Sequence, residues 1–234
     1  MDAEILYFRQ LLGGRDFGRQ HPVCGQMENF VYLIGDRQTR ECVVIDPAWC
    51  VDELCDIVEA DGMKLVGALG THYHADHVGG NMMGFSIEGI VRLLARSPCP
   101  IHVHRADAEF VRKVTAISAS DLSLRDSGDK VRAGKVELEW LHTPGHTPGS
   151  SCFRVANSLV AGDTIFLQGC GRTDLPGGDA ALMAHTLTHK IATLPDDMVL
   201  YPGHNYGGAS APMAEVKRNN PFLDAKFLRR MAGG

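Results

Sequence analysis

The sequence predicts a mixed fold of the α/β or α+β class, in which helices cover β-sheets. Strand-like and helix-like segments alternate along the chain, and the strands outnumber the helices. Of the 234 residues, 44% are hydrophobic, which is enough to build a sizeable core. Because an apolar strand face or helix stripe has to pack against another element, this alternation favours layers of sheets and helices. We expect one domain over residues 1–234, since no linker-like segment separates two compositions.

The first half of the chain carries a hairpin followed by alternating helices and strands. Two β-branched, apolar runs, Asn29–Ile34 and Glu41–Ile45, flank a polar turn at Gly35–Gln38 and predict the hairpin. Elsewhere, short apolar runs predict buried strands, and apolar residues three and four apart predict helices. On these grounds, strands are expected at Lys64–Leu69 and Ile101–His104, and helices at Val51–Ala60, Ile87–Ala95 and Ala106–Val114.

The second half of the chain is richer in strands. Val136–Trp140 alternates between apolar and polar residues, as a half-buried strand does. The last predicted helix is interrupted at Pro221, because proline has no amide hydrogen to donate. The other elements expected here are strands at Ser151–Val155, Leu159–Ala161 and Met198–Tyr201, and helices at Ala180–Thr193 and Ala214–Arg230.

The composition argues against several classes of protein. The formal charge is −5, from 23 Lys and Arg against 28 Asp and Glu, so no basic face is expected to attract a nucleic acid. No apolar run approaches the ~18 residues that span a membrane. Met1–Leu12 carries acidic residues where a signal peptide would be basic. The seven cysteines form no CxxC pair, so we expect reduced thiols and a cytoplasmic location.

A dense group of potential metal ligands directly follows the predicted strand Lys64–Leu69. In an extended chain alternate side chains point the same way, so His72, His74 and Asp76 are expected to converge on one point. His77 would then serve a neighbouring point. Imidazole and carboxylate are ligands of zinc, iron and manganese. Four such groups within a six-residue segment favour a metal site over an incidental polar loop.

Three further segments have a similar arrangement: a predicted strand is followed by a potential metal ligand beside a glycine. Their candidate ligands are His146, Asp163 and His204. Sites on α/β scaffolds are assembled at the carboxyl ends of strands. We therefore expect these three side chains to join the histidine group that follows the earlier strand.

Four motifs, THYHADHVGG, HTPGHTPGS, LVAGDTIF and YPGHNYGG, give the chain a resemblance to the metallo-β-lactamase fold superfamily. The resemblance implies a four-layer αββα sandwich with a metal site at one edge of its two sheets. It also implies two divalent metal ions, with zinc the first choice and iron or manganese as alternatives. The implied ligands are His72, His74 and His146 for one metal, Asp76, His77 and His204 for the other, and Asp163 as the bridge between them.

Within that superfamily, the chain resembles the glyoxalase II and persulfide dioxygenase branch. The segment Gly169–Gly178 begins with GCGRTD, as in persulfide dioxygenases, but RTD followed by a Pro-Gly-Gly-Asp turn is similar to short bacterial glyoxalase II-like proteins. Tyr206 matches a tyrosine that helps to hold glutathione in glyoxalase II. Only Asp224–Gly234 follows the shared ending NNPFL, so we expect no separate C-terminal glutathione-binding helical domain.

Two functions are consistent with this resemblance. The main hypothesis is a metal-dependent hydrolase of a thioester, similar to hydroxyacylglutathione hydrolase, in which a metal-bound hydroxide attacks the carbonyl. Asp76 would act catalytically by orienting the hydroxide or moving a proton. The alternative is a mononuclear iron dioxygenase acting on glutathione persulfide, with one iron held by His72, His146 and Asp163. A non-enzymatic member of the fold is disfavoured, because no ligand position is lost.

The expected partner is a small-molecule substrate, a thiol conjugate, and a homodimer is one assembly left open. Arg172 is the candidate contact for an anionic substrate group, because guanidinium pairs bidentately with carboxylate. A salt bridge from Arg172 to Asp174 or Asp179 is the alternative. The insert Met82–Pro100 either walls a substrate cleft or is core under a loop.

The remaining histidines are expected to have structural or surface roles. His142 either supports a metal-bound histidine or is purely structural. His102 and His104 lie on a strand that no Asp-His pair follows. His185 and His189 share a helix face but lack the glutamate of an HExxH motif.

Overall fold

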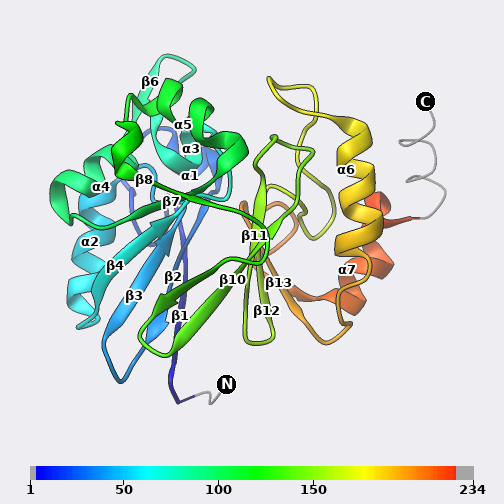
Figure 1. Ribbon diagram of the computed structural model, residues 1–234, viewed down its shortest axis with the longest axis horizontal. Coiled ribbons are helices and arrows are strands. Elements are labelled where there is room, and N and C mark those ends of the chain that lie inside the picture. The colour runs from blue at the N-terminus through cyan, green and yellow to red at the C-terminus, as the bar shows by residue number, and fades with distance from the viewer. Residues whose placement is uncertain (1–3, 225–234) are drawn as a thin grey trace.

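Two six-stranded β-sheets lie face to face in the computed structural model, which describes residues 4–224 (Figure 1). In the first sheet, the order of strands is β1 (Leu6–Leu12), β2 (Phe30–Asp36), β3 (Glu41–Ile45), β4 (Lys64–Leu69), β7 (Ile101–His104) and β8 (Leu122–Arg125). In the second, the order is β14 (Ala211–Pro212), β13 (Val199–Pro202), β12 (Ser158–Gly162), β11 (Ser151–Val155), β10 (Val136–His142) and β9 (Lys130–Ala133). The first sheet thus comes from the N-terminal half of the chain and the second from the C-terminal half.

The first sheet is buried on both faces. Because side chains alternate along a strand, successive residues of one strand pack in different clusters on its two faces. On β2, Phe30 and Tyr32 belong to the cluster between the sheets, together with Trp140 of the second sheet. The alternate residues Val31 and Leu33 belong to the cluster on the outer face. Each strand inside the sheet therefore reads as a continuous apolar run.

Helices cover the outer faces of both sheets (Figure 1). The first sheet is covered by α2 (Val51–Ala60), α4 (Ile90–Arg96) and α5 (Ala108–Thr115), and the second by α6 (Ala180–Thr186) and α7 (Met213–Asn219). On α2 the buried residues Val51, Leu54, Cys55 and Val58 form one helical face, as their spacing requires. The predicted four-layer αββα sandwich is confirmed.

Smaller elements lie between these layers. They are the short helices α1 (Cys24–Met27) and α3 (Ala75–Val78), the hairpin of β5 (Gly80–Met82) and β6 (Phe85–Ile87), and a π-helical turn, Leu187–Ile191, that continues α6. The hairpin shortens the predicted helix Ile87–Ala95, which begins only at Ile90. The last predicted helix ends at Asn219, and residues 225–230 of that prediction lie outside the described part of the chain.

The sequence pattern predicts the strands inside each sheet but misses the edge strands β1, β8, β9 and β14. Arg9 and Gln10 interrupt the apolar run of β1. On β9, Lys130 and Arg132 are exposed. Because one side of an edge strand faces solvent, its sequence does not have to be apolar.

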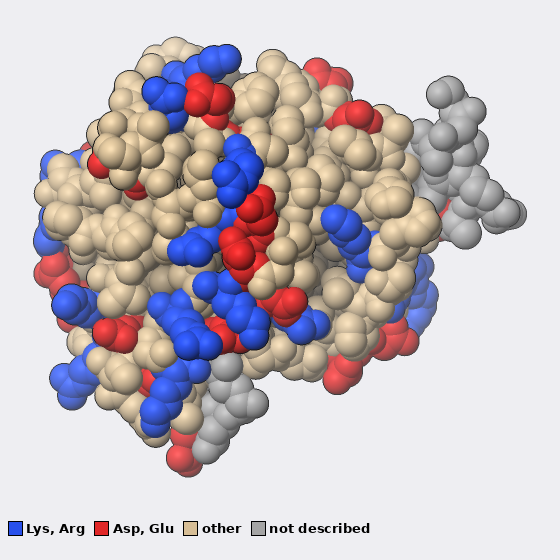
Figure 2. All heavy atoms as spheres, viewed as in Figure 1, with Lys and Arg blue, Asp and Glu red and all other residues tan. Residues whose placement is uncertain are grey.

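The surface mixes charges of both signs. On the face shown in Figure 2, Lys and Arg side chains lie next to Asp and Glu side chains. Some oppositely charged neighbours on the surface form ion pairs, as Arg132 and Glu137 do at 2.9 Å. Within residues 4–224, no helix is both long and apolar enough to cross a membrane.

Candidate metal centre

Four strands end where the candidate ligands gather, and each leads directly into at least one of them. β4 is followed by the histidine segment His72–His77, β10 by His146, β12 by Asp163 and β13 by His204. The first segment belongs to one sheet and the other three belong to the opposite sheet. The candidate centre is therefore built by both halves of the sandwich.

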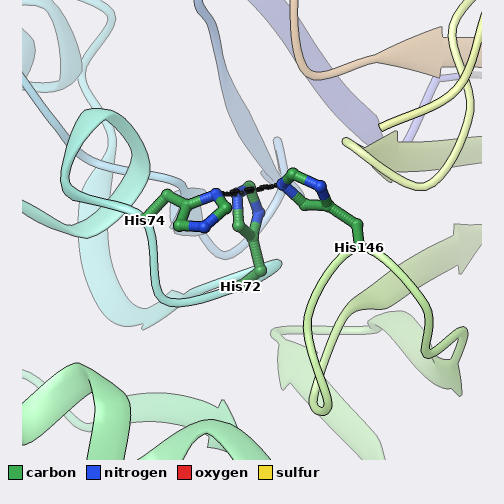
Figure 3. A group of neighbouring side chains, drawn as sticks. All are labelled: His72, His74 and His146. Carbon is green, nitrogen blue, oxygen red and sulfur yellow. Dashed lines mark hydrogen bonds between the residues drawn. The ribbon is translucent and has the colours of Figure 1, made fainter. Parts of the chain in front are cut away.

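His72, His74 and His146 turn their ring nitrogens toward one another (Figure 3). Nε2 of His146 lies 3.2 Å from Nε2 of His72 and 3.0 Å from Nδ1 of His74, and the last two nitrogens are 3.0 Å apart. Burial, assisted by the neighbouring histidines, lowers the pKa of His74 to about 4 and holds the pKa of His72 well below its ordinary value. His72 and His74 are therefore neutral near pH 7 and have a lone pair to offer a cation.

Asp76, His77 and His204 form a second buried group. Nε2 of His77 lies 3.2 Å from Nε2 of His204 and 3.4 Å from Oδ2 of Asp76. Burial opposes protonation of His77, but the carboxylates of Asp76, Asp163 and Asp46 outweigh it and raise the His77 pKa well above its ordinary value. A metal cation bound here would replace that proton.

Asp163 lies between the two groups. Its Oδ2 is 3.8 Å from Nε2 of His146 and 3.3 Å from Nε2 of His204, and its Oδ1 is 3.5 Å from Nε2 of His77. Burial opposes ionisation of Asp163, but the nearby His204 and His77 hold its pKa well below the ordinary range. Within the described residues, Oδ1 of Asp163 is buried and accepts no hydrogen bond. Because buried polar atoms are normally satisfied, this orphaned oxygen among inward-facing nitrogens fits a bound metal.

Backbone carbonyl groups fix two of the imidazole rings from the outside. Nδ1 of His146 donates a hydrogen bond to the carbonyl oxygen of Arg172 at 2.7 Å, and Nδ1 of His204 donates to that of Met27 at 2.7 Å. A neutral imidazole carries one N–H, so in the neutral form of each ring these bonds leave the Nε2 lone pair facing the centre, where a metal can take it. Such outer hydrogen bonds are typical of metal-binding histidines.

The extended geometry predicted for the histidine segment is right for His72 and His74, which converge as expected, but it is wrong for Asp76. Ala75–Val78 forms a helical turn, α3, in which the amide of His77 donates to the carbonyl oxygen of His74 at 2.9 Å. Because of this turn, Asp76 does not join His72 and His74, as side-chain alternation predicted, but lies beside His77. Gly79 follows the turn at a φ of +88°, which a residue with a Cβ rarely adopts.

Sequence analysis misses the residues that hold the second group in place. Asn29 donates from Nδ2 to Oδ2 of Asp76 at 3.1 Å and accepts from Nε1 of Trp49 at 3.0 Å. Oδ2 of Asp46 lies 2.9 Å from Nδ1 of His77. Asp46 directly follows β3, so the rule that finds ligands at strand ends would also have found it. Asn29 precedes its strand and carries no such signal.

The remaining histidines lie outside these groups. His142 has a structural role: its ring stacks on that of His104 at 3.8 Å between centroids, and its Nε2 donates to the carbonyl oxygen of Pro148 at 2.8 Å. His102 accepts a hydrogen bond from Arg125. The exposed side chains of the predicted surface pair, His185 and His189, stack on each other on α6 and the π-helical turn after it.

A cavity of about 850 Å³ opens beside the two groups. His74, Asp76, His146, Asp163 and His204 contribute to its lining. Met82 and Met83, on the hairpin of β5 and β6, line it too, so the start of the Met82–Pro100 insert walls this cavity. Tyr206 also lines it, with its ring parallel to that of His204 and 4.8 Å away.

Arg172 lines the same cavity but is paired with Asp174. Its Nε and Nη2 donate to the two carboxylate oxygens of Asp174 at 2.9 and 2.8 Å. The salt bridge considered as the alternative from the sequence is thus the one that forms. Both side chains are 68% exposed, so the pair is weak enough for a substrate anion to replace Asp174. Contact between Arg172 and substrate stays a prediction.

Comparisons with known proteins agree with this architecture. Residues 25–204, which include every residue of the two groups and Asp163, match the family model described as the metallo-beta-lactamase superfamily. The mitochondrial persulfide dioxygenase ETHE1 of Homo sapiens is 36% identical over 198 residues, covering 83% of this chain and 71% of that protein. The probable hydroxyacylglutathione hydrolase glo2 of Schizosaccharomyces pombe is 31% identical over 207 residues, covering 85% and 72%.

Among solved structures, ETHE1 from Myxococcus xanthus matches the chain over almost its whole length. The match has a TM-score of 0.75 at 30% sequence identity, and it covers 97% of this chain and 90% of that chain. The fold of this chain therefore recurs in a protein named ETHE1, and the protein of that name in Homo sapiens is called a persulfide dioxygenase.

Proposed function

The chain belongs to the metallo-β-lactamase superfamily, and we propose that it is an iron-dependent persulfide dioxygenase. The observation that carries the proposal is the more extensive similarity to the human persulfide dioxygenase, which is 36% identical over 198 residues and 71% of that protein's length. A hydroxyacylglutathione hydrolase of Polaromonas sp. is also 36% identical, but only over 182 residues and 62% of its length. This difference in extent favours the second of the two functions suggested by the sequence. Hydrolysis of a thioester becomes the alternative.

The proposed reaction converts a persulfide, R–S–SH, together with dioxygen and water into the thiol R–SH and sulfite. Both atoms of dioxygen and the oxygen of water end on the terminal sulfur. The S–S bond breaks, the inner sulfur leaves as a thiolate that takes up one proton to give the thiol, and the remaining two protons are released with the sulfite. When bound, iron supplies the electron transfer that activates dioxygen, which no protein side chain of the site supplies by itself.

His72, His146 and Asp163 would hold the iron, as two imidazoles and one carboxylate hold it in non-haem oxygenases. The Nε2 atoms of His72 and His146 are 3.2 Å apart, and Oδ2 of Asp163 lies 3.8 Å from Nε2 of His146. The ligand atoms of His72 and Asp163 lie within 4.8 Å of each other. These separations are short enough for the three side chains to hold one metal, which would supply the site at which the persulfide sulfur reacts.

Other residues of the cavity would bind substrate or hold a proton. Asp76 lines the cavity, and the amide of Asn29 donates to its Oδ2, so it is our candidate for holding or moving a proton. Tyr206, parallel to His204, is our candidate for contacting the thiol part of the substrate, and Arg172, which also lines the cavity, is our candidate for contacting a carboxylate when the substrate carries one.

The second group favours the alternative, a hydrolase with two divalent metals such as zinc. Asp76, His77 and His204 are all in place, and Asp163 lies between the groups. Two neighbouring cations can acidify a bound water and polarise a thioester carbonyl. Metal content and reaction type therefore have to be measured together.

The decisive experiment measures metal content and turnover in the same samples. Protein purified without added metal is analysed for zinc, iron and manganese, and iron-loaded protein is assayed for oxygen uptake and sulfite release with glutathione persulfide. We expect one iron per chain, turnover of the persulfide, and loss of both iron and turnover in His146→Ala. Two metals per chain with hydrolysis of S-lactoylglutathione and no oxygen uptake would overturn the proposal in favour of the hydrolase.

A matched variant tests the substrate role of Arg172. Arg172→Ala should raise KM for a carboxylate-bearing persulfide while metal content stays unchanged. Asp174→Ala, which frees the guanidinium of Arg172, should give a KM equal to or lower than that of wild type. Equal KM values in wild type and both variants would remove Arg172 from the substrate contacts.

A further inference from the structure

The lining of the cavity is apolar apart from the metal-binding groups and a few polar side chains. Met27, Met82, Met83, Val114, Phe166 and Leu175 all contribute to it. Met83 is 81% exposed at its end of the cavity. A single exposed apolar side chain is common, but Met83 is continuous with the other apolar residues of the lining, and a contiguous apolar surface commonly marks a ligand-binding site.

Charge is scarce in the same lining. Among its described residues outside the metal-binding groups, Arg172 is the only charged side chain, and it is already paired with Asp174. One arginine can pair with at most one carboxylate. Glutathione carries two carboxylates and one ammonium group, and any of these charges placed against methionine and phenylalanine would lose water without gaining a partner.

The hairpin is suited to take up an apolar group of variable shape. Met82 and Met83 lie at the end of β5 and in the turn before β6, two neighbouring methionines that face the cavity. Methionine has three rotatable bonds and a polarisable thioether, so it adapts to the surface of its partner. Phe166, itself buried, adds a rigid apolar surface to the lining.

We propose that the thiol part of the substrate is an uncharged apolar group, such as an alkyl chain, that lies against Met82, Met83 and Phe166, rather than glutathione. The proposal rests on the proposed function to the extent that this function brings the persulfide sulfur to the metal-binding groups. The reaction keeps the same balance: R–S–SH, dioxygen and water give R–SH and sulfite, and only R differs. The apolar R group would lose its hydration on binding, which supplies the binding free energy.

The test compares two substrates and two variants of the iron-loaded protein. Wild type should turn over hexyl persulfide with a kcat/KM about ten-fold or more above that for glutathione persulfide. Met83→Glu should lower the value for hexyl persulfide by about ten-fold and leave that for glutathione persulfide equal or higher. Val91→Glu is the matched control, because Val91 is 48% exposed on α4 and does not line the cavity. It should change neither value.

The outcomes separate this inference from the proposed function. Faster turnover of glutathione persulfide, or a Met83→Glu protein indistinguishable from wild type, would overturn the inference while the dioxygenase remains. If neither persulfide is consumed, the proposed function fails, and binding decides the inference. In that case, calorimetric titration of metal-loaded protein should show tighter binding of 1-hexanethiol than of glutathione, weakened by Met83→Glu. Equal or reversed affinities would overturn it.

Discussion

At the residue scale, Asp107 is a buried carboxyl group whose protein partners are all hydrogen-bond donors. Its Oδ2 accepts from the amide of Tyr73 at 3.2 Å and from Oγ1 of Thr147 at 2.7 Å. Its Oδ1 accepts from the amide of Gly149 at 2.6 Å. Tyr73 lies between His72 and His74 in the chain, and Thr147 follows His146. Asp107 therefore joins the two segments that carry the first histidine group.

Replacing Asp107 by alanine should loosen this group. The change leaves three buried donors without an acceptor, at a cost on the order of 3 kcal/mol in free energy of unfolding. We expect that loss in a denaturant titration, together with a lower metal content after purification. Asp126→Ala is the control, because Asp126 is an exposed acid whose ion pair, with Arg105, lies at the surface. A metal content equal to wild type in Asp107→Ala would refute the linking role.

The same carboxyl group should make stability depend on pH. Burial raises the pKa of Asp107 to about 6, although hydrogen bonds from Thr147, Gly149 and Tyr73 oppose the increase. The folded state therefore keeps a proton between about pH 4 and pH 6 that the unfolded chain has released. The stabilisation is complete below about pH 4 and is lost as the pH rises past 6. It amounts to about 3 kcal/mol, from ~1.4 kcal/mol per pH unit.

Comparison with Asp107→Asn isolates this effect, because asparagine does not titrate. The free energy of unfolding of wild type minus that of the variant, both measured without metal, should fall by about 3 kcal/mol between pH 4 and pH 7. Other titrating groups cancel in the difference. A difference that does not change with pH would mean that the carboxyl group titrates normally in the folded protein.

At the element scale, the loop that carries His146 packs against the first turn of α6. Gly145 adopts a φ of +140°, and a Cβ at this position would lie 2.4 Å from Cα of Met183 and 2.6 Å from its amide nitrogen. The carbonyl oxygen of Gly145 also accepts a hydrogen bond from the amide of Asp179 at 2.8 Å, directly before the helix. Only glycine allows the loop and helix to approach this closely.

Gly145→Ala should therefore separate the loop from α6. We expect a loss of stability on the order of 3 kcal/mol, since backbone atoms have to move, and a lower metal content because His146 moves with the loop. Gly128→Ala is a matched control: Gly128 also has a positive φ, of +90°, but a Cβ there meets nothing within 4 Å. It should cost only the backbone strain, about 1 kcal/mol, with normal metal content. If the two substitutions lowered stability and metal content equally, the loss would come from backbone strain at a positive φ alone, and the contact between the loop and α6 would have no part in it.

The position and type of some elements can be predicted from the sequence, whereas others cannot. β3, β4, β7 and β11 begin and end where apolar runs predict, because interior strands are apolar on both faces. β1 is missed because Arg9 and Gln10 are compatible with a solvated edge. The candidate site follows the same logic. His146, Asp163 and His204 are found because each follows an interior strand, whereas Asp107, in a 3-10 turn before α5, has a role set only by tertiary contacts.

At the scale of the whole molecule, the two sheets come from separate halves of the chain and meet at the candidate metal centre. His72 and His74 follow a strand of the first sheet, and His146 and Asp163 follow strands of the second. A cation that binds both sets holds the halves together in the folded state only. It should stabilise the fold by RT ln(1 + [L]/Kd), about 2.7 kcal/mol at a free metal concentration 100-fold above Kd.

Removing the metal should therefore lower Tm. For a chain of 234 residues, about 2.7 kcal/mol corresponds to a decrease in Tm of roughly 5–11 °C on addition of a chelator. His146→Ala should lose most of this chelator-dependent difference, because it removes one of the ligands that join the halves. The double variant His185→Ala, His189→Ala should keep the full difference, since both side chains are exposed and outside the two groups. A chelator effect as large in His146→Ala as in wild type would place the stabilising metal elsewhere, and then the two halves would be held together by the core between the sheets alone.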